Sequence, residues 1–167
     1  MKKILVTIVT LMLLCSCSIT NNNKVYEEKY LNLIDTVSEH TEFASFSNHF
    51  DITTDINQTG DGHYRYFVIV DNPRVAMYGI EIVAVEKGIN YANNMAANVG
   101  VLDDTSYNLI PGQARPEAGY YKGVTVSGIS ASENPTIDVL VQWHGKDQNI
   151  IQEFFEFVIG HTEEVDG

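Results

Sequence analysis

The segment TIDVLVQWH, from Thr136 to His144, carries the clearest strand pattern in this chain of 167 residues. Its apolar side chains fall at every second position, which is typical of a β-strand with one buried face. These positions are Ile137, Val139, Val141 and Trp143. Gly145 to Gln148 then has the composition of a tight turn, and a second strand follows from Ile150 to Ile159. The two segments predict an antiparallel hairpin.

A second hairpin is predicted nearer the N-terminus. Apolar and polar residues alternate from Phe50 to Asn57, and another apolar-rich segment runs from Tyr64 to Val70. Between them, Gln58 to Gly62 contains two glycines, which accept the positive φ angles of turns. Ala76 to Glu86 has apolar residues on both faces, which indicates an interior strand covered on both sides. The two expected faces are Tyr78, Ile80, Ile82 and Ala84, and Met77, Val83 and Val85.

Tyr120 to Ile129 predicts one more strand, in which Gly123 and Gly128 indicate a bulge or a bend. The segments amount to about six or seven strands with turn signals between them. No alternating strand–helix units of the parallel kind occur. The pattern predicts a mainly β fold, an antiparallel Ig-like β-sandwich. The likeness is to Ig-like architecture in general, because the cysteine pair of antibody domains is missing.

One α-helix is expected before the strands, from Lys24 to Glu39. Apolar residues recur there at spacings of three and four, so they share one helical face. They are Tyr26, Tyr30, Leu33, Ile34 and Val37. We expect this face to pack on the sheet. Helix and strands together predict a single domain over residues 24–160, which is large enough to form its own core.

The segment from Asn90 to Gln113 has the least regular pattern. Tyr91 to Val99 is compatible with a short helix or a loop, and Ser106 to Ile110 with a brief strand. Because loops on a rigid scaffold often carry binding residues, this segment and the neighbouring loops are the candidate contact surface.

The N-terminal residues have the parts of an export signal. Two lysines precede an apolar run from Ile4 to Leu14, which is much shorter than the roughly 20 residues that span a bilayer. Leu14-Cys15-Ser16-Cys17 follows and resembles the lipobox of bacterial lipoproteins. The resemblance implies cleavage after residue 16 and a diacylglyceryl group on Cys17. Two acyl chains on one cysteine suffice for a stable membrane anchor.

The lipobox assignment divides the N-terminus into a signal peptide (1–16) and a lipidated Cys17 with a flexible spacer (17–23). It locates the protein on the extracytoplasmic face of the cell membrane. Cys15 is a rival attachment point, and an uncleaved anchor helix or an unlipidated secreted protein are the alternatives. Since these are the chain's two cysteines, no disulfide is expected in the mature domain.

The charge of the chain restricts its partners. It contains 22 acidic and 10 basic residues, a net charge of −12, and ends in an acidic tail over residues 161–167. Nucleic acid is excluded as a partner, because phosphate binding needs clustered Lys and Arg. Anionic lipid surfaces are repelled, so the expected membrane contact is the lipid anchor alone. The acids are dispersed, which favours a role in solubility over acidic docking.

Motifs for metal binding and catalysis are incomplete. Asp55 to Asp61 partly matches a calcium loop, but the position of the bidentate Glu is Tyr66, so a plain turn is favoured. Gly128 to Ser132 is a near miss of the nucleophile elbow. No histidine belongs to a metal-ligand pair, although His49 and His63 are candidates to approach each other across the first hairpin. No catalytic residue, metal or cofactor is predicted.

Four aromatic residues are candidates for a platform that binds a sugar or a peptide: Tyr107, Tyr120, Tyr121 and Trp143. Core and rim positions are the favoured alternative. Three other segments, Met95 to Gly100, Asn108 to Pro111 and Gly119 to Gly123, make the chain similar to an uncharacterised family of small lipoproteins of Gram-positive bacteria. That resemblance implies no activity.

The main hypothesis is a non-enzymatic, membrane-tethered binding or accessory module for an envelope protein, peptide or glycan. The alternatives are a structural or adhesive component of the envelope and an enzyme without a recognisable motif. A small closed pocket would favour ligand binding, and an exposed aromatic row would favour adhesion.

Overall fold

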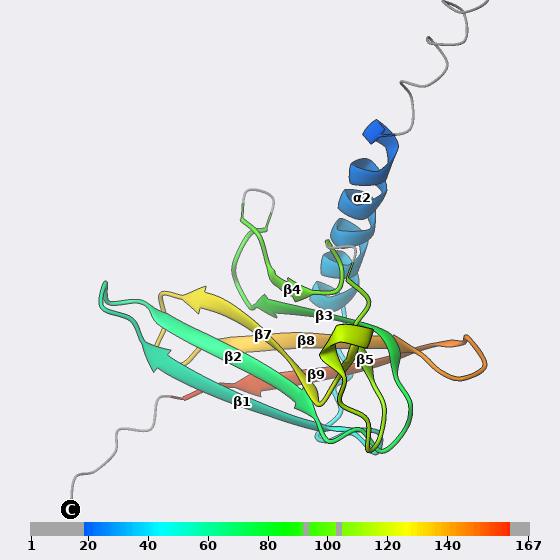
Figure 1. The fold of residues 1–167 in the computed structure, drawn as a ribbon. Helices are drawn as coiled ribbons and strands as arrows, with labels where there is room; N and C mark the ends of the chain where they lie inside the picture. Colours follow the sequence, from blue (N-terminus) through cyan, green and yellow to red (C-terminus); the bar gives the residue numbers. More distant parts are fainter. Residues whose placement is uncertain (1–18, 92–93, 103–104, 161–167) are drawn as a thin grey trace, which may run out of the picture.

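The computed structural model describes residues 19–91, 94–102 and 105–160. The predicted signal peptide, Cys17 and the acidic tail at 161–167 lie outside these ranges. Within them the fold is mainly β with one α-helix, and the predicted antiparallel β-sandwich with an N-terminal helix is confirmed (Figure 1).

Two antiparallel sheets form the sandwich. The three-stranded sheet has the order β1 (Asp51–Gln58), β2 (Tyr64–Asp71), β7 (Gly123–Ser130). The four-stranded sheet has the order β4 (Ala97–Val99), β3 (Tyr78–Glu86), β8 (Thr136–His144), β9 (Ile150–Val158). A small parallel pair joins β5 (Asn108–Leu109) and β6 (Tyr120–Tyr121), and a 3₁₀ helix, η1 (Pro116–Ala118), precedes β6. Both predicted hairpins, β1–β2 and β8–β9, are confirmed.

The main core lies between the two sheets. The predicted buried face of β8 is confirmed, because all four of its alternating apolar side chains are buried in this core. From β9 the core receives Phe155, and from β2 it receives Val68 and Val70. Burial of these large apolar side chains is the dominant force that holds the sheets together.

Helix α2 (Ile19–Ser38) covers the outer face of the four-stranded sheet. Leu33, Ile34 and Val37 pack against Val83 and Leu140. Strand β3 is therefore buried on both faces, as predicted. In Figure 1 the N-terminal end of the helix points away from the sheets.

The helix begins earlier than predicted, at Ile19 instead of Lys24. The expected flexible spacer over residues 17–23 is thus helical from Ile19 onward. Neither Gly nor Pro occurs between Ile19 and Asn23, so no residue there forces the helix to end.

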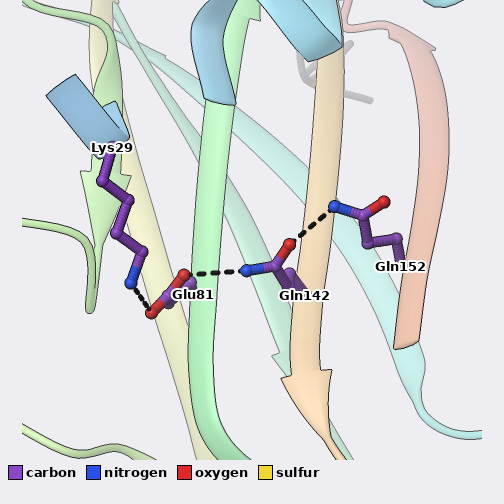
Figure 2. A network of polar contacts seen from close by, with 4 residues as sticks. All are labelled: Lys29, Glu81, Gln142 and Gln152. Atoms are coloured by element: carbon purple, nitrogen blue, oxygen red, sulfur yellow. Dashed lines mark hydrogen bonds and ion pairs between the residues drawn. The ribbon is translucent and has the colours of Figure 1, made fainter. Parts of the chain in front are cut away.

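In addition to the apolar contact between α2 and the sheet, a row of polar side chains connects the helix to the strands (Figure 2). Lys29 of α2 forms an ion pair with Glu81 of β3. Glu81 Oε2 accepts a hydrogen bond of 3.0 Å from Gln142 Nε2 on β8, and Gln142 Oε1 accepts one of 2.6 Å from Gln152 Nε2 on β9. The row crosses four elements and fixes the helix against three neighbouring strands.

The predicted face of Met77, just before β3, is wrong. Met77 lies in the main core with Ile80, not on the helix side with Val83. The pairing with β8 shifts between Tyr78 and Glu81, where Gly79 has a φ of +56°. This β-bulge adds one residue to β3. The side chains that precede the bulge therefore point to the opposite faces from those that the simple alternation predicts.

The strand predicted from Tyr120 to Ile129 is divided into β6 and β7 by a bend at Lys122, beside Gly123. No bulge forms at Gly128, since β7 pairs with β2 in unbroken register. Gly128 serves a different purpose there. A Cβ at this position would overlap the ring and hydroxyl of Tyr66, with Cε1 only 2.7 Å away. Glycine is therefore needed for the close approach of the tyrosine.

We expect Gly128→Ala to lower the free energy of unfolding by about 1–3 kcal/mol, because the added methyl group overpacks the core. Gly60→Ala is the matched control, since no atom lies within 4 Å of a Cβ built there. Urea denaturation of both variants measures the difference. Equal stability of the two would contradict the steric account.

The helix considered for Tyr91 to Val99 is not formed. Tyr91 begins a turn, and Ala97–Val99 pairs with β3 as strand β4. Asparagine amides bond to nearby backbone carbonyls, Asn94 to Asn90 and Asn98 to Ala96, which favours a turn over a helix. The brief strand expected within Ser106 to Ile110 is confirmed as β5.

Candidate functional site

A cleft of about 710 Å³ lies at one end of the sandwich, where three loops meet. These loops are the β2–β3 connection, the turn that follows β5 and the β8–β9 turn, which Figure 1 shows extending beyond the sheets. Its apolar lining includes Val75, Ile110, Trp143 and Ile151. Its polar lining includes His49, Arg74, Tyr78, Gln113, Lys146 and Asp147. We call this site the loop-end cleft.

Trp143 makes the cleft continuous with the core. The side chain is fully buried, and the rings of His49 and Phe50 meet it edge to face at centroid distances of 5.5 and 5.7 Å. Its Nε1–H has no hydrogen-bond partner among the described residues. The indole therefore forms the base of the cleft, and its N–H is the one polar group that it carries.

His49 is held by a carboxylate from the opposite end of the chain. Its Nδ1 lies 2.6 Å from Glu153 Oε1 on β9. Its backbone carbonyl accepts a hydrogen bond of 2.7 Å from the backbone N–H of Arg74. These contacts fix the imidazole and join the loop before β1 to the β2–β3 connection.

A histidine oriented by a carboxylate is the base half of a catalytic triad. The described residues that line the loop-end cleft include no Ser, Thr or Cys to serve as the nucleophile. The arrangement fixes a side chain in place, which suits binding better than acyl transfer.

The charged groups at the rim differ in how far they are neutralised. Arg74 forms an ion pair with Asp51, which also accepts a hydrogen bond of 3.0 Å from Asn72. The Arg74 and Asn72 contacts hold the pKa of Asp51 below its ordinary value. Lys146 has no acidic partner in the described part of the chain.

A second groove, of about 590 Å³, lies between β7 and the segment that leads into β4. We call it the β4–β7 groove, and its lining includes Tyr66, Glu86, Tyr91, Met95 and Ile129. Two of its polar lining residues, Glu86 and Tyr91, have partners within the protein. Glu86 Oε1 accepts a hydrogen bond of 2.8 Å from Ser130 Oγ, and the Tyr91 hydroxyl accepts one of 2.7 Å from the Glu86 backbone N–H.

Burial raises the pKa of Tyr66 and of Tyr91, so both hydroxyls stay protonated and neutral at ordinary pH. Glu86 and Tyr91 of the β4–β7 groove are thus bonded within the protein. The segment from Asn90 to Gln113, expected as the contact surface, contributes residues to both this groove and the loop-end cleft.

His49 and His63, the candidates to approach each other across the first hairpin, lie far apart along β1. His49 precedes β1, while His63 precedes β2 and lies beyond the other end of β1, with its Nδ1 3.4 Å from Asp61. Asp55, in the calcium-like segment, accepts hydrogen bonds from the Ile56 backbone and the Asn57 amide. Within the described ranges no group of three potential metal ligands occurs.

The remaining candidates have structural roles. Ser130, from the near miss of the nucleophile elbow, is buried at the end of β7 and bonded to Glu86. The favoured core and rim positions of the aromatic residues are confirmed. Trp143 is buried, and the rings of Tyr107 and Tyr121 pack at 5.3 Å beside the core. Among the described helices, none is long and apolar enough to cross a membrane.

A buried carboxyl gives the domain a pH-dependent contribution to stability. Asp138 is 3% exposed, and Lys87 Nζ lies 3.6 Å from its Oδ1. Burial raises the pKa of Asp138 above its ordinary value, and the attraction of Lys87 offsets only part of that effect. The folded state therefore holds this proton more tightly than the unfolded state.

It follows that protonated Asp138 adds to the free energy of unfolding at low pH. This contribution is lost as the pH rises through the folded-state pKa of Asp138. We expect Asp138→Asn to gain stability relative to the native protein between pH 4 and pH 7, because asparagine stays neutral. Urea denaturation at the two pH values measures this gain. Asp35→Asn, on the exposed face of α2, is the control. A loss of relative stability at pH 7 would refute the assignment.

No protein-family model and no curated protein matches this chain. Among solved structures, it is similar to the X-ray structure of the Northeast Structural Genomics Consortium target SoR45. The identity is 12%, the similarity covers 74% of this chain and 98% of that chain, and the TM-score is 0.40. A similarity at this level carries no argument about function, which has to be inferred from the loop-end cleft itself.

Proposed function

We propose that this protein is a membrane-tethered, extracytoplasmic binding module that holds a small ligand in the loop-end cleft. The observation that carries the proposal is the cleft. Its volume of about 710 Å³ lies within the range of about 300–1,000 Å³ that small-molecule sites occupy. An apolar base with a few polar groups at the rim is the composition such sites share.

The aromatic residues favour this function over adhesion to a glycan or protein surface. Every Tyr, Phe and Trp of the chain lies in the described ranges, and Phe46, at 70%, is the one that is exposed. An aromatic row at the surface, which an adhesive component would use, is absent from those ranges. A concave site is therefore the better supported place of contact.

The tether of the proposal is the lipid on Cys17. The described part of α2 starts at Ile19, two positions after Cys17 in the sequence. The apolar face of α2 is packed on the four-stranded sheet, so the anchor would connect to the domain through a helix rather than a long flexible linker.

The binding part of the proposal is tested with N-phenyl-1-naphthylamine, a neutral apolar probe, and the fluorescence of Trp143. As the single tryptophan of the chain, Trp143 reports on the loop-end cleft without interference. We expect energy transfer from Trp143 to the bound probe. Val75→Phe, which fills the cleft, should weaken binding. Val158→Phe, on β9 away from the cleft, should leave it unchanged.

Equal binding by both variants would show that the probe sits elsewhere, and no energy transfer in the native protein would contradict a ligand site at Trp143. Circular dichroism of each variant confirms that the domain remains folded.

A further inference from the structure

The inference below rests on the proposed function, since it concerns the ligand of the same cleft. We infer that the loop-end cleft selects small organic anions, ligands with an apolar body and a carboxylate, sulfonate or phosphate group. The acidic and the basic groups around the cleft differ in the partners that they have within the protein.

Two of the three acidic groups around the cleft have a basic partner, and the third accepts hydrogen bonds from a neutral amide. Asp51 is paired with Arg74 and bonded to Asn72. Asp147, in the β8–β9 turn, accepts hydrogen bonds from the backbone and the side chain of Asn149. Glu153 is bonded to His49 through one oxygen, and its other oxygen is buried away from solvent. Asp51 and Glu153 are therefore held by Arg74 and His49, while Asp147 keeps an exposed negative charge beside Lys146.

The donors, in contrast, are available. Lys146 lines the cleft, is exposed and has no acidic partner among the described residues. The Arg74 side chain donates through one nitrogen to Asp51, which leaves other N–H groups of a guanidinium that has five. Within the described chain, the Tyr78 hydroxyl and the Gln113 amide also have no hydrogen-bond partner.

A charged ligand group in a partly apolar site needs both a counter-charge and donors. The loop-end cleft offers a free ammonium and several N–H and O–H donors above an apolar base. This local excess of donors contrasts with the net charge of −12 for the chain, which by itself would repel anions. A small anion with an apolar body matches both the apolar residues and the hydrogen-bond donors that line the cleft.

The inference is tested with a pair of probes that share an apolar body. 8-Anilinonaphthalene-1-sulfonate carries an anionic group that N-phenyl-1-naphthylamine lacks. We expect the native domain to bind the sulfonate probe more tightly, as measured by energy transfer from Trp143. Lys146→Gln should weaken binding of the sulfonate about two- to fivefold, the effect of one exposed ion pair, and leave the neutral probe unchanged.

Lys24→Gln is the matched control, because it removes the same charge from α2, where Lys24 pairs with Glu28 at 3.9 Å in solvent. This control separates a local contact from the general effect of net charge. Equal affinities for the two probes, or equal losses in the two lysine variants, would overturn the anion selectivity while the binding function stands. Failure of both probes to bind would contradict the proposed function as well.

Discussion

Trp143→Ala is expected to lower the free energy of unfolding by about 3–5 kcal/mol, as large-to-small substitutions of buried aromatic residues do. The side chain is fully buried and contacts His49 and Phe50 at the base of the loop-end cleft. Its removal leaves a cavity that the two sheets cannot close by local adjustment. Urea denaturation followed by circular dichroism measures the loss.

Two further variants make this result specific. Phe46→Ala removes an exposed aromatic side chain and should change stability by less than about 1 kcal/mol. Trp143→Phe removes the Nε1–H that has no partner but keeps an aromatic ring, so it should cost less than the alanine variant. A Trp143→Ala domain as stable as the native one would contradict the assignment of Trp143 to the core.

Cys17→Ala is expected to release the protein from the membrane fraction. Two acyl chains on one cysteine give stable anchoring, and the charge of the domain offers no attraction to anionic lipid that could replace them. Membrane fractionation and intact mass measure the effect, with a lipid-sized mass increment expected in the native protein and lost in the variant. Cys15→Ala is the control and should retain both the lipid and the membrane location.

A native protein that is released and carries no lipid would refute the lipobox assignment. Loss of the lipid in Cys15→Ala instead of Cys17→Ala would move the anchor to the rival cysteine.

The strands were predictable wherever burial on one face imposes a simple alternation. Thr136 to His144 is the clearest case, because its four alternating apolar residues all lie in the main core. The face of Met77 was not predictable, since the bulge between Tyr78 and Glu81 depends on pairing with β8. The role of Gly128 was not predictable either. A glycine is needed there because the Tyr66 ring approaches from a neighbouring strand, and local sequence does not reveal that contact.

The loop-end cleft could be predicted only in part. The sequence indicated a contact surface near residues 90–113, and Ile110, Pro111 and Gln113 do line the cleft. The partnership of His49 with Glu153 joins residues 104 positions apart, and no local pattern encodes such a contact. Lys146 was recognisable as a turn residue, but its lack of an acidic partner depends on the surrounding fold.

The most direct test of the central claim, that the loop-end cleft is the binding site, is a nuclear magnetic resonance titration of the ¹⁵N-labelled protein with 8-anilinonaphthalene-1-sulfonate. The single tryptophan gives one indole N–H signal. We predict that this signal and the backbone amides of Val75, Gln113 and Lys146 shift with a common affinity. Shifts confined to Met95 and Ile129 in the β4–β7 groove, or no shifts at all, would contradict the account.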